Sequence, residues 1–115
     1  MNQWLGIHPS ELCRQHLLGV HGELHKFLPS WKKRQDCTNR VTLGQMQCVG
    51  YAERHLEIAD EMLRRKMNHR SPLEQPDFSY LPVHVSTGIV SSEQHQANRT
   101  ELARRCSECR KRMAT

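Results

Sequence analysis

Three stretches of the chain place apolar residues at the spacing of an α-helix. The first runs from residue 9 to residue 28, between Pro9 and Pro29, which suits a helix that starts at one proline and stops or kinks at the next. The second runs from about 45 to 67 and the third from about 92 to 113. The apolar positions expected to face the core are Leu12, Leu17, Leu18, Leu24, Phe27 and Leu28, then Leu56, Ala59, Met62 and Leu63.

The segments between these stretches lack a helical period. Residues 31–40 form a basic run that we expect to be a loop, and residues 68–88 contain three prolines. We expect 68–88 to be an ordered loop that wraps the helices, with Ser91 or Ser92 as the N-cap of the third helix. Together the segments predict an all-α, single compact domain over 1–115, with three main helices and long ordered loops. The expected anchors of the long loop are Leu73, Phe78, Tyr80 and Leu81.

The composition favours a lean core and an anionic partner. Only 37% of the residues are hydrophobic, and 17 Lys and Arg against 12 Asp and Glu give a net charge of +5. Such an excess suits nucleic acid before a membrane. No run of eighteen apolar residues is present, and the first ten residues do not resemble a signal peptide, so we expect a cytoplasmic protein without a membrane partner.

The basic residues gather in three places along the chain. Such runs are usually solvated faces, but three of them in one small domain also suit a surface that follows DNA phosphates. Trp4, Trp31 and Tyr80 either stack on bases or fill the core. The clusters are Lys32, Lys33 and Arg34, then Arg64, Arg65, Lys66 and Arg70, and finally Arg99, Arg104, Arg105, Arg110, Lys111 and Arg112.

The run HGELHK, residues 21–26, looks like a broken zinc-protease motif. At about 100° per residue, His21 and His25 share one helix face and Glu23 points nearly opposite. A zinc protease needs its glutamate directly after the first histidine, so we expect two solvated surface histidines. Glu23 instead shares a stripe with His16, Gly19 and Lys26, which is either a solvated face or a face that meets a ligand.

The five cysteines are an odd number, and free thiols are the default in a reducing compartment. Cys106 and Cys109 stand one helical turn apart, but a structural zinc needs four ligands and no second pair is placed by a motif. The sequence therefore predicts core or surface thiols, no metal and no cofactor. The residues that a fold could still bring to this pair are Cys13, Cys37, Cys48 and His95.

The order of residues also resembles a known family. The run HPSELCRQHLLGVHGELHK, residues 8–26, is similar to the first helix of phage-type pyrimidine-dimer DNA glycosylases, the endonuclease V class of UV-repair enzyme. EMLRRKMNHRSP, residues 61–72, resembles a second family segment, and DFSYLP, residues 77–82, is a weaker echo. The motif positions of the first helix are Ser10, Glu11, Leu12, Gln15, His16, Leu17, Glu23 and Leu24.

The resemblance implies an all-helical enzyme that flips a nucleotide out of double-stranded DNA, and we expect the protein to be a monomer. In the family the N-terminal α-amine attacks the sugar C1′ and forms an imine, and β-elimination then cuts the strand without a metal. By that resemblance Glu23 is the acid/base residue. The nucleophile is the amine of Asn2 if Met1 is removed, or that of Met1 itself. The expected substrate and DNA contacts are Gln15, His16, Lys26, Arg64, Arg65, Arg70, Arg104 and Arg105.

Some positions depart from the family pattern. The family carries a basic residue at the position of Gln3 and arginine at the positions of Gly22 and Lys26. Residues 105–115 also lack the family's C-terminal aromatic residues. Two alternatives therefore remain beside a pyrimidine-dimer glycosylase. One is a glycosylase or lyase for another modified base, and the other is a non-catalytic, basic, helical DNA-binding protein.

Overall fold

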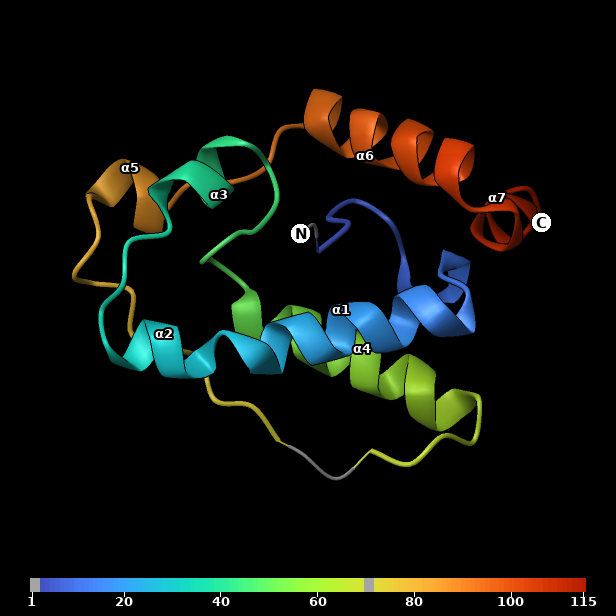
Figure 1. Ribbon diagram of the computed structural model, residues 1–115, viewed down its shortest axis with the longest axis horizontal. Helices are drawn as coiled ribbons and strands as arrows, with labels where there is room; N and C mark the ends of the chain where they lie inside the picture. Colours follow the sequence, from blue (N-terminus) through green and yellow to red (C-terminus); the bar gives the residue numbers. More distant parts are fainter. Residues whose placement is uncertain (1–2, 70–71) are drawn as a thin grey trace.

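The computed structural model describes residues 3–69 and 72–115, and within these residues the chain is helical and contains no strand (Figure 1). The all-α prediction is confirmed. The three longest helices are α1, α4 and α6, as the three apolar stretches predict. The elements in chain order are η1 (Pro9–Glu11), α1 (Arg14–Lys26), α2 (Leu28–Lys32), α3 (Thr38–Thr42), α4 (Tyr51–Arg64), α5 (Val83–Ser86), α6 (Ser92–Arg105) and α7 (Ser107–Met113).

The first predicted helix, residues 9–28, is interrupted: it consists of the 3-10 turn η1, two extended residues and α1. After the 3-10 turn η1 the backbone is extended at Leu12 and Cys13, and the Cys13 side chain caps α1 by accepting the N–H of His16. Helix α1 ends at Lys26 with Phe27 as its C-cap, close to the stop that Pro29 predicts. Pro29 then lies in the first turn of α2, where its missing N–H has no cost. The basic run 31–40, expected as a loop, thus holds the end of α2 and part of α3.

Helix α4 is shorter than predicted and turns a different face to the core. It begins after Gly50, whose φ of 74° suits glycine. Ala59 and Met62 are buried as expected, but Leu56 and Leu63 are 60% and 56% exposed, so their assignment to the core is wrong. The buried face instead includes polar side chains, which an apolar pattern cannot identify. Those side chains are Arg54, His55 and Glu61.

The third predicted helix divides at Cys106, where an extended backbone (φ −130°, ψ 111°) separates α6 from α7. The predicted N-cap is confirmed, because the Ser91 side chain accepts the N–H of Gln94. No helix among the described residues combines the length and apolar character needed to cross a lipid bilayer.

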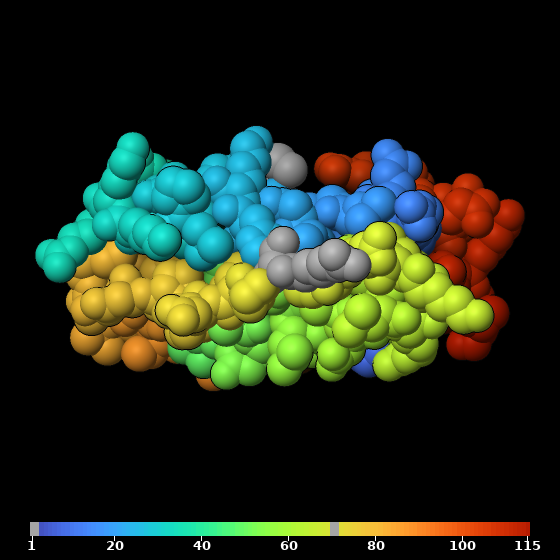
Figure 2. Space-filling view, turned by 90° about the horizontal axis from the view of Figure 1, so that it is seen from below, coloured from blue at the N-terminus to red at the C-terminus, as the bar shows by residue number. Residues whose placement is uncertain are grey.

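The molecule is flat, about 40 × 33 × 17 Å. Helices α1 and α4 pack against each other, and the segment that follows α4 runs along the face beside them (Figure 2). Phe78 and Leu81 anchor that segment in the core, and Leu73 and Tyr80 are partly buried against it, as predicted. The N-terminal segment lies between α1 and α6 (Figure 1), and this arrangement forms the site described next.

Candidate active site

One cavity of about 540 Å³ combines parts of the chain that are far apart in sequence. It lies between the N-terminal segment, α1 and α6. The cavity brings together four residues that the sequence analysis selected, Gln15, His16, Glu23 and Arg105. The full lining is Trp4, Gln15, His16, Gly19, Val20, Glu23, Gln45, Glu101 and Arg105.

Glu23 forms the floor of this cavity and is only 2% exposed. Its carboxylate accepts a hydrogen bond and ion pair from the guanidinium of Arg40 in α3. Arg40 also stacks over the Phe27 ring, 4.4 Å from its centroid. The carboxylate is thus held by a cation rather than solvated, and it faces away from His21 and His25 as helix geometry predicts.

The N-terminal segment is fixed by a buried arginine of α4. Arg54 donates hydrogen bonds to the carbonyl oxygens of Gln3, Trp4 and Ile7 at 3.0–3.2 Å. Burial lowers the pKa of Arg54, but these carbonyls satisfy much of its donor capacity. The Gln3 N–H donates to the carbonyl of Gln45, which lines the cavity.

The described part of this segment therefore begins beside the cavity. Asn2, the predicted nucleophile, and Met1 lie outside the described residues.

The α6 side of the cavity carries opposite charges. Arg104 and Arg105 both donate to the carboxylate of Glu101, and these hydrogen bonds lower the pKa of Glu101 to about 2. Across the cavity, burial lowers the pKa of His16, which favours its neutral imidazole. The site thus presents one neutral imidazole and carboxylates that are each paired with arginine.

The other predicted DNA contacts that the structure describes are not part of the cavity lining. Lys26 and Arg64 are exposed, and Arg64 pairs with Glu61. Arg65 is engaged inside the protein, since it binds Glu61 and donates to the carbonyls of Pro9, Ser10 and Leu12. Arg104 is exposed beside the cavity, and Arg70 lies outside the described residues.

Sequence reasoning missed three residues that build the site, Arg40, Gln45 and Arg54. Arg40 lies in a run that looks like a solvated basic loop. Arg54 stands three residues before Glu57 on the same helix, which suggests an ordinary surface ion pair. The structure contains that pair, with 3.8 Å between the guanidinium of Arg54 and the carboxylate of Glu57. Only the fold brings these side chains to Glu23 and to the N-terminal segment.

Two clusters of metal-ligating side chains also form among the described residues. One combines Cys13, His16, Cys106 and Cys109, and the other combines His21, His25, His55 and His69. The expectation of solvated surface histidines at positions 21 and 25 is wrong, because both are half-buried and pack their rings against the ring of His55. Cys37 and Cys48 are free, as predicted, and both are buried in the core.

Comparison with known proteins identifies the family of this chain. No curated protein and no solved structure matches it. The family model described as pyrimidine dimer DNA glycosylase matches residues 1–75, which include the N-terminal segment, Glu23, Arg40, Gln45 and Arg54. Helices α6 and α7, with Glu101 and Arg105, lie beyond the matched range. Since the match covers more than half of the sequence, the chain belongs to the pyrimidine dimer DNA glycosylase family.

Proposed function

We propose that this protein removes a damaged pyrimidine from duplex DNA and then cuts the strand at the resulting abasic site, with the N-terminal amine as nucleophile and Glu23 as acid/base. Family membership makes DNA the substrate class. The observation that carries the proposal is the position of Glu23, buried at the floor of a cavity beside which the described N-terminal segment begins.

The chain length allows the amine to reach the cavity. Gln3 is tied to Gln45 in the cavity wall, and one or two residues separate Gln3 from the N-terminal amine, a reach of roughly 7 Å at most. An α-amine has a reference pKa of about 7.7 to 8.0, so part of the population is neutral and nucleophilic near neutral pH. The amine belongs to Asn2 if Met1 is removed and to Met1 otherwise.

The proposed reaction has two stages. First the amine nitrogen bonds to C1′ while the C1′–N glycosidic bond breaks and the base leaves with a proton. The C1′–O4′ bond then opens, which gives an imine between the sugar and the protein. In the second stage a proton leaves C2′ and the C3′–O bond breaks, which cuts the strand. A carboxylate close to C1′ stabilises the cationic species and carries the protons.

The cavity suits an extruded nucleotide, because the sugar of a stacked base pair gives no access to C1′. Its volume of about 540 Å³ is within the range of small-molecule sites. Arg105 at its rim and the exposed Arg104 and Lys26 supply positive charge for the phosphates on either side. Gln15 and His16 supply polar groups within the cavity.

Covalent trapping with borohydride tests this proposal, since the reagent reduces an imine to a stable adduct. The substrates are duplexes that contain a UV dimer, an abasic site or uracil. We expect an adduct and a cut strand with the dimer and the abasic site. Glu23→Gln should lose cutting and keep DNA binding, while the matched control Glu93→Gln, an exposed carboxylate of α6, should keep both.

The outcomes separate the alternatives. An adduct with uracil but not with the dimer would assign another base, and an adduct with the abasic site alone would make the protein a lyase. Binding without any adduct would indicate a non-catalytic DNA-binding protein, and unchanged cutting by Glu23→Gln would exclude the role of this residue. Mass spectrometry of the trapped peptide identifies whether Asn2 or Met1 carries the sugar.

A further inference from the structure

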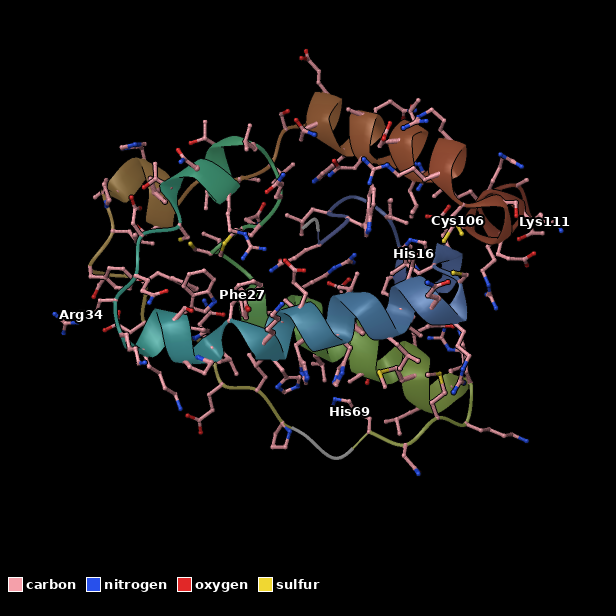
Figure 3. All side chains as sticks on the ribbon, viewed as in Figure 1. His16, Phe27, Arg34, His69, Cys106 and Lys111 are labelled. Carbon is pink, nitrogen blue, oxygen red and sulfur yellow. The ribbon has the colours of Figure 1, made fainter. Side chains whose placement is uncertain are left out.

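Four metal-ligating side chains meet where the start of α1 packs against α7, and their donor atoms lie within 4.8 Å of one another. Cys13 Sγ lies 3.8 Å from Cys106 Sγ. Nδ1 of His16 lies 3.2 Å from Cys13 Sγ and 3.5 Å from Cys109 Sγ. Sulfur atoms gather beside His16 and Cys106 in Figure 3. Three cysteines and one histidine thus point into one small volume.

These separations fit a tetrahedral zinc ion. Bond lengths of about 2.3 Å to sulfur and about 2.0 Å to nitrogen separate two ligand sulfurs by about 3.8 Å, and a sulfur and a nitrogen by about 3.5 Å. The Cys13–Cys106 distance and the two distances from His16 agree with these values to within a few tenths of an ångström. The sulfurs are also too far apart for a disulfide, which requires about 2.05 Å, and all of these cysteines are free.

Backbone N–H groups point at all three sulfurs. Cys109 Sγ accepts the N–H of Cys13 at 3.2 Å, Cys106 Sγ accepts the N–H of Cys109 at 3.4 Å, and Cys13 Sγ accepts the N–H of His16 at 3.5 Å. Hydrogen bonds of this kind stabilise a thiolate, which is the form that binds zinc. The fold therefore supplies the ligand geometry together with one N–H donor to each sulfur.

We propose that Cys13, His16, Cys106 and Cys109 form a structural zinc site that fastens α7 to the start of α1. Four protein ligands leave no open coordination position, so the zinc holds the structure and takes no part in the reaction. This inference goes beyond the proposed function and does not depend on it.

The site connects two distant parts of the chain, since Cys13 and Cys106 stand 93 positions apart in the sequence. Cys13 and His16 lie in the range that the family model matches, and Cys106 and Cys109 lie beyond it. A metal at this point fixes the end of α6, which carries Arg105 in the cavity wall. Coordination through Nδ1 would also fix the orientation of the His16 ring at the cavity. A small domain with a lean core gains stability from such a cross-link.

Metal content and cobalt substitution test the proposal on untagged, reduced, full-length protein. We expect bound zinc, and after exchange to Co²⁺ an intense near-ultraviolet band from sulfur-to-cobalt charge transfer. Cys106→Ala should lose that band and weaken zinc binding by more than the roughly 100-fold typical of lost second-shell partners. Cys106→His should retain zinc, since imidazole is also a zinc ligand. The matched control Cys37→Ala removes a buried thiol outside the site and should keep the band.

Circular dichroism of each variant shows whether it is folded. A folded wild-type protein that gives no charge-transfer band with Co²⁺ would overturn the proposal. So would a band that survives Cys106→Ala unchanged. Loss of the band in Cys37→Ala, with the fold intact, would assign the metal to different thiols and would also overturn it.

A second cluster carries a separate inference. His21 and His25 of α1, His55 of α4 and His69 of the segment after α4 bring their ring nitrogens within 4.8 Å of one another. Figure 3 shows His69 beside the α1–α4 pair. Nε2 of His55 lies 2.9 Å from Nε2 of His25 and 3.2 Å from Nε2 of His69.

Hydrogen bonding does not account for all of these contacts. Each nitrogen of a neutral imidazole either donates one proton or accepts one hydrogen bond through its lone pair. Nε2 of His55 can therefore form a full hydrogen bond with Nε2 of His25 or with Nε2 of His69, but not with both. Nε2 of His21 is buried and has no hydrogen-bond partner among the described residues. A metal ion that accepts a lone pair from each ring would satisfy every one of these nitrogens.

We infer that these four histidines bind a divalent transition metal, with Co²⁺ as the probe, and so fasten α1 to α4 and to the segment that follows it. In the cobalt-substituted Cys106→Ala protein, this site should give d–d absorption without sulfur charge transfer. Adding His25→Ala to the Cys106→Ala protein should remove that absorption and the remaining bound metal. Adding His84→Ala, a change of an exposed histidine outside the cluster, should change neither. A folded Cys106→Ala protein that binds no metal, or a folded Cys106→Ala/His25→Ala double variant that keeps it, would overturn the inference.

Discussion

Arg40 of α3 donates a hydrogen bond to the carboxylate of Glu23 in α1, and this contact closes the floor of the cavity with a buried ion pair. The pairing connects the residue that the family motif identifies to one that no motif identifies. It keeps the charge of Glu23 compensated in a dry environment, where an unpaired carboxylate would be costly. Arg40 therefore positions the carboxylate and does not itself need to touch the substrate.

Replacing Arg40 by Gln should weaken both folding and strand cutting. The change leaves Glu23 buried without a cation, which should cost about 1–3 kcal/mol of stability. Cutting of an abasic duplex should slow by about 10- to 100-fold, because the carboxylate loses its fixed position. Urea denaturation and single-turnover cleavage measure the two effects.

The control for this prediction is Arg34→Gln, a change of an exposed arginine in the same basic run, which should alter neither quantity. The double variant Glu23→Gln/Arg40→Gln should lose less unfolding free energy than the two single variants lose in sum, because the two residues share one interaction. Simple additivity would contradict the contact.

Gly19 and Gly22 offer a matched test of the cavity. Both lie within α1, and beyond the neighbouring residues and the backbone of the helix itself, a Cβ atom at either position would meet no atom within 4 Å. Leucine at either position should therefore stabilise the helix by about 0.5–1 kcal/mol. Only Gly19 lines the cavity, so Gly19→Leu should reduce kcat/KM for the damaged duplex by on the order of 100-fold, while Gly22→Leu should leave it nearly unchanged.

Thermal unfolding and steady-state cleavage of both variants check this prediction. Equal activity of the two proteins would show that the substrate does not enter beside Gly19. An equal loss of activity in both would indicate that the outer face of α1, and not the cavity, contacts the DNA.

We expect Glu101 to compete with DNA phosphate for Arg104 and Arg105. Arg104 and Arg105 both donate to its carboxylate at 2.6 Å, and the low pKa of about 2 keeps it charged at neutral pH. Glu101→Gln should free both guanidinium groups at the cavity rim and tighten DNA binding by about fivefold at low salt. Fluorescence anisotropy over a range of salt concentrations measures the affinity and its salt dependence.

The matched control is Glu108→Gln, which removes an exposed carboxylate that pairs with Lys111 and lies outside the cavity lining. It should have a smaller effect than Glu101→Gln. Weaker binding by the Glu101 variant would mean that the carboxylate positions the arginines for DNA and does not compete with it.

The sequence predicted the helical class and the approximate places of the three long helices, because apolar spacing and prolines are local signals. It also selected Glu23, Gln15, His16 and Arg105 for one site, and the fold brings all four to one cavity. The choice of Glu23, Gln15 and His16 rests on the resemblance of one helix to a family, because the spacing alone favoured a solvated face. Their roles stay predictions.

The parts that failed depend on long-range contacts. Leu56 and Leu63 looked like core residues, yet the face of α4 that meets α1 contains His55 because three other histidines pack there. Cys13 and Cys106 could not be paired from spacing, because 93 residues separate them. Buried polar contacts of this kind have no periodic signal, and the same limitation hid Arg40 and Arg54.

The pair of Glu11 and Arg99 gives a prediction for acid stability. Two hydrogen bonds of 2.7 and 2.8 Å join the side chains and tie η1 to α6. The hydrogen bond from Arg99 is the main reason that the pKa of Glu11 lies below its ordinary value of 4.5. For a carboxyl whose pKa is lower in the folded state, the stabilisation is present above the unfolded pKa and is lost as the pH falls through the folded pKa.

Glu11→Gln should therefore destabilise the protein near pH 7 and lose its effect in acid. Because both side chains are partly exposed, we expect a deficit of about 1 kcal/mol at pH 7. This deficit should shrink as the pH falls below 4.5, because the carboxyl of Glu11 in the wild-type protein then becomes protonated and loses its ion pair with Arg99. Glutamine can still accept the His8 N–H that Glu11 accepts at 3.2 Å, so the comparison isolates the charge. Urea denaturation of both proteins with chelator present, at steps from pH 7 downward, measures the difference, and Glu93→Gln serves as the exposed control. A deficit that stays constant over this range would mean that packing of the side chain, and not its ion pair with Arg99, holds η1 against α6.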